Sequence, residues 1–236
     1  MKIDTTFNFQ AAMGSPDKDA DRYSQILQDY HHFLWSKTLP NGELFNLEKL
    51  NNACLLLYTS PSGELVLSSD RAVATFSTWK RLQHIIEQIP RYELEQFIDT
   101  TETIGGIIIW PSQKIDGKST INGERGFNRK ICDRLDLTVE CIKRYYQGED
   151  SPLYETLKRY SLFFDLFKDF KGYVDFFLLQ DFVSSDYSSI IIAPPFDNYQ
   201  SSTVPSTVDE YIAYMNKTTE LIKARDLLIA EYVSQL

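Results

Sequence analysis

The sequence predicts an α+β fold: a mainly helical single domain, residues 1–236, around one small, largely antiparallel sheet of about four or five strands. Three observations predict it. Apolar residues recur at helical spacing in most long segments, and several short apolar runs lie between Gly and Pro residues. No internal repeat, linker or low-complexity tract divides the chain. A chain of 236 residues can also bury a substantial core without disulfides or metals.

Individual elements are expected where apolar residues repeat regularly between turn residues. Short apolar or alternating runs predict strands at about 43–48, 53–59, 64–69, 105–111 and 189–193, with 60–63 as a hairpin turn. Helical spacing predicts helices from Ser15-Pro16 to the turn at 39–42, over 79–89, 92–99 and about 126–147, from Ser151-Pro152, within 173–183, and from the capping box Thr207-x-x-Glu210 onward. Helices therefore dominate the predicted fold.

The charge of the chain is unevenly distributed. The formal net charge is -9, which argues against nucleic-acid binding across a broad surface, because phosphate contacts need clustered Lys and Arg. Between Ser112 and Arg144, however, eight basic residues stand against five acidic ones, so this segment is +3 and the remainder is -12. A small basic patch that binds a nucleotide, or DNA locally, is compatible with this distribution.

The cysteines and histidines do not predict a metal site. Cys54, Cys132 and Cys141 form no CxxC motif, and adjacent His31 and His32 project about 100° apart on a helix. We therefore expect no metal, no disulfide framework and no cofactor.

The sequence also predicts a location and leaves the assembly open. The N-terminus has no apolar leader, and no apolar run reaches the length of about 18 residues that a membrane span needs. A cytoplasmic protein without membrane contact is expected, while the oligomeric state is not predicted.

The segment Asn122–Arg144 is the strongest candidate for a functional surface. Its predicted helix has an apolar face formed by Ile131, Leu135, Val139, Ile142 and Tyr146. Its opposite face is charged, formed by Arg129, Asp133, Asp136, Glu140 and Arg144, with Arg134 and Thr138 on the flank. A solvated face with an ordinary Glu140–Arg144 pair is the default interpretation. Leu137 and Cys141 interrupt that face, which indicates that it is partly covered.

The functional interpretation of this segment is an anion site beside a carboxylate. Asn122 and Arg125 would hold a phosphate or another anion where a helix begins at a Gly-flanked Arg. Either Asp133 or Asp136, close to Arg134, would be a catalytic carboxylate held in its charged form by a guanidinium. Such a carboxylate can orient water or stabilise a positively charged, sugar-like transition state.

Three residues outside the segment are further candidates for substrate binding. Asp70 follows a predicted strand and could contribute to a cleft, although a capping turn is the default interpretation. Trp110 ends the predicted strand 105–111 and adds a large aromatic surface. Asp181 lies inside an apolar run, and a buried carboxylate must have a partner.

Four stretches carry a resemblance to a bacterial and phage domain family of unknown function. They are His31–Gly42 (HHFLWSKTLPNG), Ile121–Gly126 (INGERG), Asp133–Ile142 (DRLDLTVECI) and Tyr173–Asp181 (YVDFFLLQD). The resemblance spans nearly the whole chain and implies one domain, but it implies no reaction. The chain is also similar in size to anti-phage DNA glycosylases, which stack an extruded base in a pocket. The aromatic content of 14% is compatible with that similarity, and the net charge of -9 is against it.

The first function hypothesis is therefore a hydrolase that cleaves an N-glycosidic bond of a nucleobase, in DNA or a nucleotide, with a DNA glycosylase in anti-phage defence as one form of it. Carboxylate, guanidinium and stacking aromatic side chains together suit this reaction. The alternative is a non-catalytic protein-interaction or nucleotide-binding regulatory domain, in which the acidic body is the binding surface. No Walker loop, nucleophile elbow or HExxH motif is present to suggest another reaction.

Overall fold

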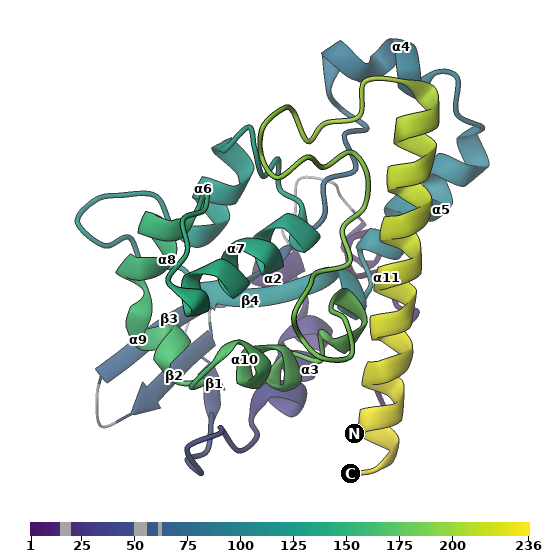
Figure 1. Cartoon of the computed structure of the whole chain (residues 1–236). Coiled ribbons are helices and arrows are strands. Elements are labelled where there is room, and N and C mark those ends of the chain that lie inside the picture. The colour runs from purple at the N-terminus through teal and green to yellow at the C-terminus, as the bar shows by residue number, and fades with distance from the viewer. Residues whose placement is uncertain (15–19, 50–55, 61–62) are drawn as a thin grey trace.

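The computed structural model describes residues 1–14, 20–49, 56–60 and 63–236 (Figure 1). Its described strands form one antiparallel sheet in the order β1-β2-β3-β4. They are β1 (Leu47–Lys49), β2 (Leu56–Ser60), β3 (Gly63–Arg71) and β4 (Ile107–Pro111). The predicted class, a mainly helical α+β fold around one small antiparallel sheet, is confirmed.

The strands differ from the prediction at their ends. Thr38 and Leu44 form only an isolated bridge, so the first strand begins at Leu47. Ser60 pairs with Gly63, as a hairpin requires, while residues 61–62 lie outside the described residues. β3 continues to Arg71, because its last residues pair with the start of β4. The capping turn considered for Asp70 is therefore wrong.

The predicted strand at 189–193 is also wrong. Ile190 makes a single bridge with Val183, and the surrounding segment has no other strand pairing. The N–H of Ala193 donates instead to the Asp136 carboxylate, so a side chain takes the place of a neighbouring strand.

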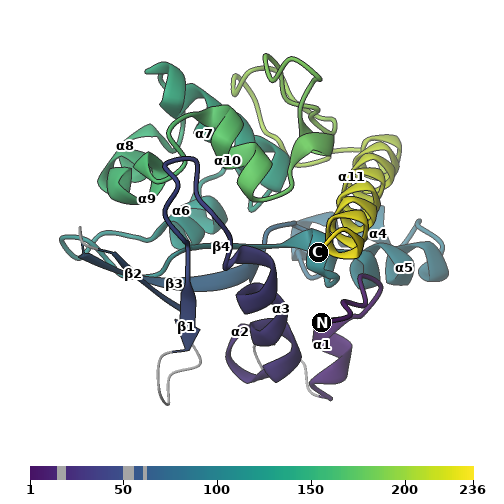
Figure 2. The same ribbon diagram turned by 90° about the horizontal axis from the view of Figure 1, so that it is seen from below.

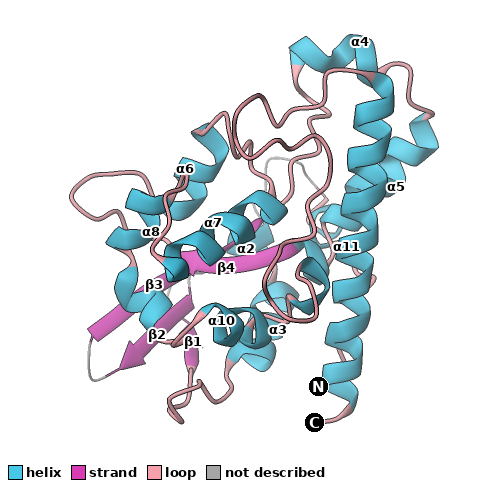
Figure 3. Ribbon diagram, in the orientation of Figure 1, coloured by secondary structure: helices cyan, strands magenta, loops and turns pink. Residues whose placement is uncertain are grey.

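Helices occupy most of the remaining chain (Figure 3). They are α1 (Phe9–Ala12), α2 (Ala20–Tyr23), α3 (Gln25–Trp35), α4 (Gln83–Ile86), α5 (Arg91–Thr101), α6 (Ile121–Phe127), α7 (Leu135–Gln147), α8 (Tyr154–Arg159), α9 (Ser161–Asp165), α10 (Phe170–Phe176) and α11 (Val208–Ser234). Single 3-10 turns lie at η1 (Lys80–Leu82), η2 (Ile104–Gly106) and η3 (Gln180–Phe182).

Several helix boundaries follow local chemistry that the apolar period does not reveal. The predicted start at Ser15-Pro16 lies outside the described residues, and Ser24 begins α3 by accepting a hydrogen bond from the N–H of Leu27 at 3.2 Å. The predicted helix within 173–183 ends at Phe176, since Leu178 adopts a left-handed conformation with φ 53°. At the start of α11 the expected cap is present, because Thr207 accepts from the N–H of Glu210.

The elements form layers with the sheet in the middle (Figure 2). Helices α7 to α10 cover one face of the sheet, α2 and α3 lie against the other, and α11 runs along the side. Much of the aromatic surplus packs between the sheet and the α7–α10 layer. Phe167, for example, lies with its ring 5.0 to 5.3 Å from the rings of Phe163, Tyr173, Phe176 and Phe177. These rings form core and not a ligand-stacking surface.

Two buried neighbours on α11 fasten it to the sheet. Arg225, fully buried, donates to the carbonyl oxygens of Gly105 and Ile107 at the start of β4, at 2.9 and 2.8 Å. Asp226 accepts from the N–H of Gly105 and from the hydroxyl of Thr103, both at 2.7 Å. A Cβ atom on Gly105 would lie 2.6 Å from a backbone oxygen of α11, so this close approach requires glycine.

No helix within the described ranges is both long and apolar enough to cross a bilayer.

We expect Asp226 to make stability fall as pH rises. Burial raises the pKa of Asp226 from 3.8 to about 6, against the hydrogen bonds from Thr103 and Gly105. Between pH 4 and 6 the carboxyl is then protonated in the folded chain and ionised in the unfolded chain. The free energy of unfolding, relative to Asp226→Asn, should fall across this window by on the order of 3 kcal/mol, at about 1.36 kcal/mol per pKa unit.

Urea titrations of both proteins from pH 4 to 7 measure this difference. Asp186→Asn is a matched control, since hydrogen bonds from Ser184 and Ser188 lower the pKa of exposed Asp186 to about 2. That variant should run parallel to the wild type between pH 4 and 6. Parallel curves for Asp226→Asn would contradict the prediction.

Candidate active site

The predicted helix over about 126–147 is two helices with a tight turn between them. α6 begins earlier, at Ile121, where the hydroxyl of Thr120 accepts from the N–H of Gly123 at 3.1 Å. Beyond Asn128 the chain leaves the helix through Cys132 and Asp133, whose φ angles of 51° and 61° are left-handed. α7 then begins at Leu135. The expected start of a helix at Gly126 is wrong, since α6 already begins at Ile121, while the anion site at Asn122 and Arg125 stays a prediction.

This turn exists because the two helices use each other's polar groups. The N–H of Asp133 donates to the carbonyl of Arg125 at 3.1 Å, and the Arg125 side chain donates back to the carbonyl of Asp133 at 3.3 Å. The same side chain donates through Nε to the hydroxyl of Thr138 on α7, at 2.8 Å. One arginine therefore fixes the angle between α6 and α7.

Arg125 is fully buried behind the sheet edge. It donates to the carbonyl of Ala72, just after β3, at 2.9 Å, and its guanidinium carbon lies 4.5 Å from the ring centre of Trp110. Its Nη1 lies 3.1 Å from Oδ1 of Asp133 and 3.8 Å from Oδ2 of Asp70, yet forms no hydrogen bond with a described residue. The positive charge is thus placed between two carboxylates.

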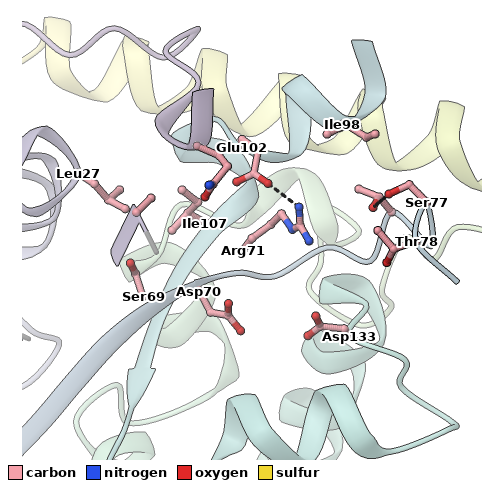
Figure 4. Close-up of a pocket in the computed structure, with 13 residues that line it drawn as sticks. Leu27, Ser69, Asp70, Arg71, Ser77, Thr78, Ile98, Glu102, Ile107 and Asp133 are labelled. Atoms are coloured by element: carbon pink, nitrogen blue, oxygen red, sulfur yellow. Dashed lines mark hydrogen bonds and ion pairs between the residues drawn. The ribbon is translucent and has the colours of Figure 1, made fainter. Parts of the chain in front are cut away.

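These two carboxylates face a cavity of about 490 Å³ (Figure 4). Asp70 projects from β3 and Asp133 from the turn before α7, and the two side chains are 40% and 35% exposed. Both oxygens lie within 4 Å of one Arg125 nitrogen, so they are at most about 7 Å apart.

The rest of the cavity wall consists of residues that the sequence did not point to. Arg71 and Glu102 form an ion pair of 2.5 Å across it, and Ser69, Thr75, Ser77 and Thr78 contribute hydroxyl groups. Leu27, Ile98 and Ile107 make the apolar part of the wall. In the sequence, only the polar run at the end of β3 indicated this wall. The other lining residues come from loops and helices that have no distinctive sequence pattern.

Arg134 and Asp136, in contrast, form a closed structural pair. Arg134 donates to both carboxylate oxygens of Asp136, at 3.2 and 2.7 Å, and to the carbonyls of Ala193, Pro195 and Thr203. Although burial opposes its charge, the paired Asp136 carboxylate raises the pKa of Arg134 above its usual value. Asp136 also accepts from the N–H groups of Leu137 and Ala193. The pair ties the segment 193–203 to the start of α7.

The charged face of α7 is therefore mostly covered, and the default interpretation of a solvated face is wrong. Asp136 and Glu140 are 5% and 6% exposed, and Glu140 binds both Lys143 and Arg144, at 2.9 and 2.7 Å. Cys141 contacts the Tyr199 hydroxyl at 3.3 Å, which brings the 193–203 segment over this face. The cover indicated by Leu137 and Cys141 is confirmed.

The remaining candidates lie away from the cavity wall. Asn122 lies inside α6, and its side-chain oxygen is buried with no hydrogen-bond donor among the described residues. Trp110 is fully buried and donates to the Tyr173 hydroxyl at 3.0 Å, with the Arg125 guanidinium over its ring. Asp181 is half-buried in η3, where burial and Glu231 raise its pKa. The structure thus brings Asp70, Asp133 and Arg125 together and leaves Asn122 and Asp181 elsewhere.

The described cysteines lie in the interior and form no metal site. Cys132 and Cys141 are buried free thiols, and burial raises the pKa of each. Cys54 lies outside the described residues. Among residues that the structure describes, no group of three or more His, Cys, Asp or Glu side chains could hold a metal ion.

Comparison with known families gives one result. Residues 3–229 match the family of unknown function DUF6994. The chain belongs to this family. The resemblance to a family of unknown function is thereby confirmed over nearly the whole chain, and the similarity to DNA glycosylases stays a prediction. No curated protein and no solved structure matches the chain.

Removing Arg134 should destabilise the protein strongly. In Arg134→Ala the buried Asp136 carboxylate loses its counter-charge and three carbonyls lose a donor, so the free energy of unfolding should fall by about 3–5 kcal/mol. Arg91→Ala is the control, because Arg91 pairs with Glu95 at 2.7 Å on an exposed helix surface. That exposed pair should contribute about 0.5 kcal/mol or less. Chemical denaturation of both variants measures the difference, and equal losses would contradict the assignment of Arg134 as a structural residue.

Proposed function

We propose that this protein is a hydrolase that cleaves the N-glycosidic bond of a nucleoside, with Asp133 as the catalytic carboxylate. The observation that carries the proposal is the pair of Asp70 and Asp133 carboxylates at one cavity, with the buried charge of Arg125 between them. The cavity volume of about 490 Å³ lies within the range of small-molecule sites.

Charge supports the cleavage of a sugar bond. Asp70, Asp133 and Glu102 contribute three negative charges, and Arg71 and Arg125 contribute two positive ones. The site thus has one negative charge in excess. Departure of a base from C1′ gives the sugar ring positive charge in the transition state, and fixed carboxylates stabilise such a charge. The hydroxyl groups of Ser77 and Thr78 on the same wall suit the hydroxyls of a ribose.

In the proposed reaction, one water molecule is consumed. The bond between C1′ and the base nitrogen breaks, and its electron pair leaves with the base. Asp133 stabilises the cationic ring while Asp70 takes a proton from the water whose oxygen bonds to C1′. That proton is finally transferred to the departed base, so the products are the free base and the free sugar.

The same features favour a nucleoside over a nucleotide or DNA. A net negative site repels a phosphate group. Of the eight basic residues between Ser112 and Arg144, Arg125 and Arg134 are fully buried and Lys143 and Arg144 pair with Glu140, which leaves a smaller basic surface than the sequence predicted. No aromatic side chain among the described residues lines the cavity, whereas enzymes that extrude a base from DNA usually stack it on one.

Asp133→Asn should lower kcat for base release by about 10²–10⁴-fold, because the amide cannot carry the negative charge that the transition state needs. A panel of ribonucleosides and deoxyribonucleosides, read out as released base by chromatography, measures the activity. The free energy of unfolding should change by about 1 kcal/mol or less, since Asn keeps an oxygen beside Arg125. Asp209→Asn is the control: Asp209 is exposed in the first turn of α11, and its replacement should leave kcat unchanged.

Three other outcomes separate the alternatives. Saturable binding of nucleosides without any released base would favour the regulatory binding domain. Base release from oligonucleotides but not from nucleosides would support cleavage of the N-glycosidic bond and contradict the nucleoside as the substrate. Full activity in Asp133→Asn would reject the assignment of this residue.

A further inference from the structure

A second cavity, of about 420 Å³, contains a lysine in an unusual environment. Lys37 follows α3 and lines this cavity together with the 167–176 segment. Its Nζ lies 5.3, 4.8 and 4.7 Å from the ring centres of Trp35, Phe176 and Tyr232. The amine is thus surrounded by apolar surface while its residue borders open space. This cavity shares no lining residue with the cavity of Asp70 and Asp133.

Lys37 has no acidic partner among the residues that the structure describes, although an aspartate lies nearby. Asp175 also lines the cavity, but its Oδ2 accepts from Lys171, and its Oδ1 accepts from the Tyr187 hydroxyl and the Gln180 amide at 2.7 and 3.1 Å. No carboxylate of a described residue lies within 4 Å of the Lys37 amine. The natural counter-ion is therefore occupied by other donors.

A second buried cation lies near the same ring. The Arg225 guanidinium carbon lies 6.0 Å from the centre of the Trp35 ring that Lys37 contacts. Burial first, and then the charge of Arg225, lower the pKa of Lys37 to about 7, while Asp175 acts in the opposite direction. The three rings favour the ammonium by cation–π attraction of roughly 0.5–2 kcal/mol, which is smaller than the cost of burying an unpaired charge. A large fraction of this amine is then unprotonated at neutral pH, when it is a nucleophile.

We infer that Lys37 is a covalent site for a small anionic carbonyl compound, which its amine captures as an imine. The unprotonated Nζ attacks the carbonyl carbon, and the resulting carbinolamine loses one water to form the C=N bond. No oxidant or reductant is needed. A lysine in a desolvated pocket beside another cation is the environment in which enzymes activate an amine for this reaction.

Lys168 is the cation that would pair with an anionic ligand in this cavity. The charged and titratable side chains near Lys37 come from each surrounding element: Lys168, Asp169, Lys171, Asp175, Arg225 and Tyr232. Lys171 is paired with Asp175, while Asp169 keeps its negative charge and accepts from the N–H of Gly172 at 2.7 Å. Lys168 is exposed at the cavity and has no ion pair among the described residues, so its ammonium group can pair with a carboxylate or phosphate on the ligand.

Reductive trapping with glyoxylate tests the inference on the intact protein. Glyoxylate and cyanoborohydride convert an imine into a stable carboxymethyl-lysine, which peptide mass mapping assigns to a position. At pH 7 we expect Lys37 to be modified at least tenfold faster than Lys168, Lys171 or Lys217. Its rate should rise with pH to a plateau with a midpoint near 7, because about half of the amine is unprotonated there.

Two variants serve as controls. Lys37→Met, a neutral side chain of similar length, should keep the thermal unfolding midpoint near that of the wild type and lose the fast-reacting site. Lys168→Met should slow trapping of glyoxylate at Lys37 by about threefold or more, without slowing trapping of neutral acetaldehyde. Modification of Lys37 at the rate of the exposed lysines would overturn the inference. An equal effect of Lys168→Met on both aldehydes would overturn the preference for an anion.

Discussion

The candidate site depends on the hydrogen bonds and ion pairs of the buried Arg125 guanidinium. The guanidinium joins the end of β3 through Ala72, the turn at Asp133 and the first turn of α7 through Thr138, while its plane lies over Trp110. These elements are distant in the sequence, and the site exists only where they meet. The charge that fixes the backbone also stands between the two carboxylates of the cavity. Structure and electrostatics at this site therefore have one common cause.

Two further buried arginines repeat this arrangement at other junctions. Arg134 binds three carbonyls of the 193–203 segment, and Arg225 binds carbonyls at the start of β4 and after α10. Burying a guanidinium is costly unless its donors are satisfied, so each segment can reach its carbonyl positions only in the native fold. In a chain with few strands, these contacts replace the backbone pairing that a larger sheet would provide.

The sequence predicted the class of the fold and most of its helices and strands, because these depend on local periods and caps. Ile131, Leu135, Val139 and Ile142 form the buried face of the segment as expected. The break between α6 and α7 was missed, since the apolar period continues across it. Its local sign was Asn128, whose side chain accepts from the N–H of Lys130 and so turns the chain out of the helix.

The site was harder to predict than the fold because burial of charge is a tertiary property. Arg125 and Arg134 have the same local pattern as exposed arginines, and only the packing of the sheet edge and of the 193–203 segment places them inside. Arg71 and Glu102 lie 31 residues apart, and no spacing rule connects them. The sequence could thus point to the segment that carries the carboxylates, but it could not say which of them meets a cavity.

Backbone conformation distinguishes Asp133 from Asp136, which were equal candidates for the catalytic carboxylate in the sequence. Asp136 lies in regular helix and each of its oxygens accepts hydrogen bonds, so its role is accounted for by the fold. Asp133 has a left-handed φ of 61° and follows Cys132, which is also left-handed. This conformation costs non-glycine residues free energy on the order of 1 kcal/mol. A fold that needed this turn only for connection could use glycine there at lower cost. An aspartate in this position, with its carboxylate beside a buried arginine and at the edge of a cavity, is compatible with the chemistry proposed for that carboxylate.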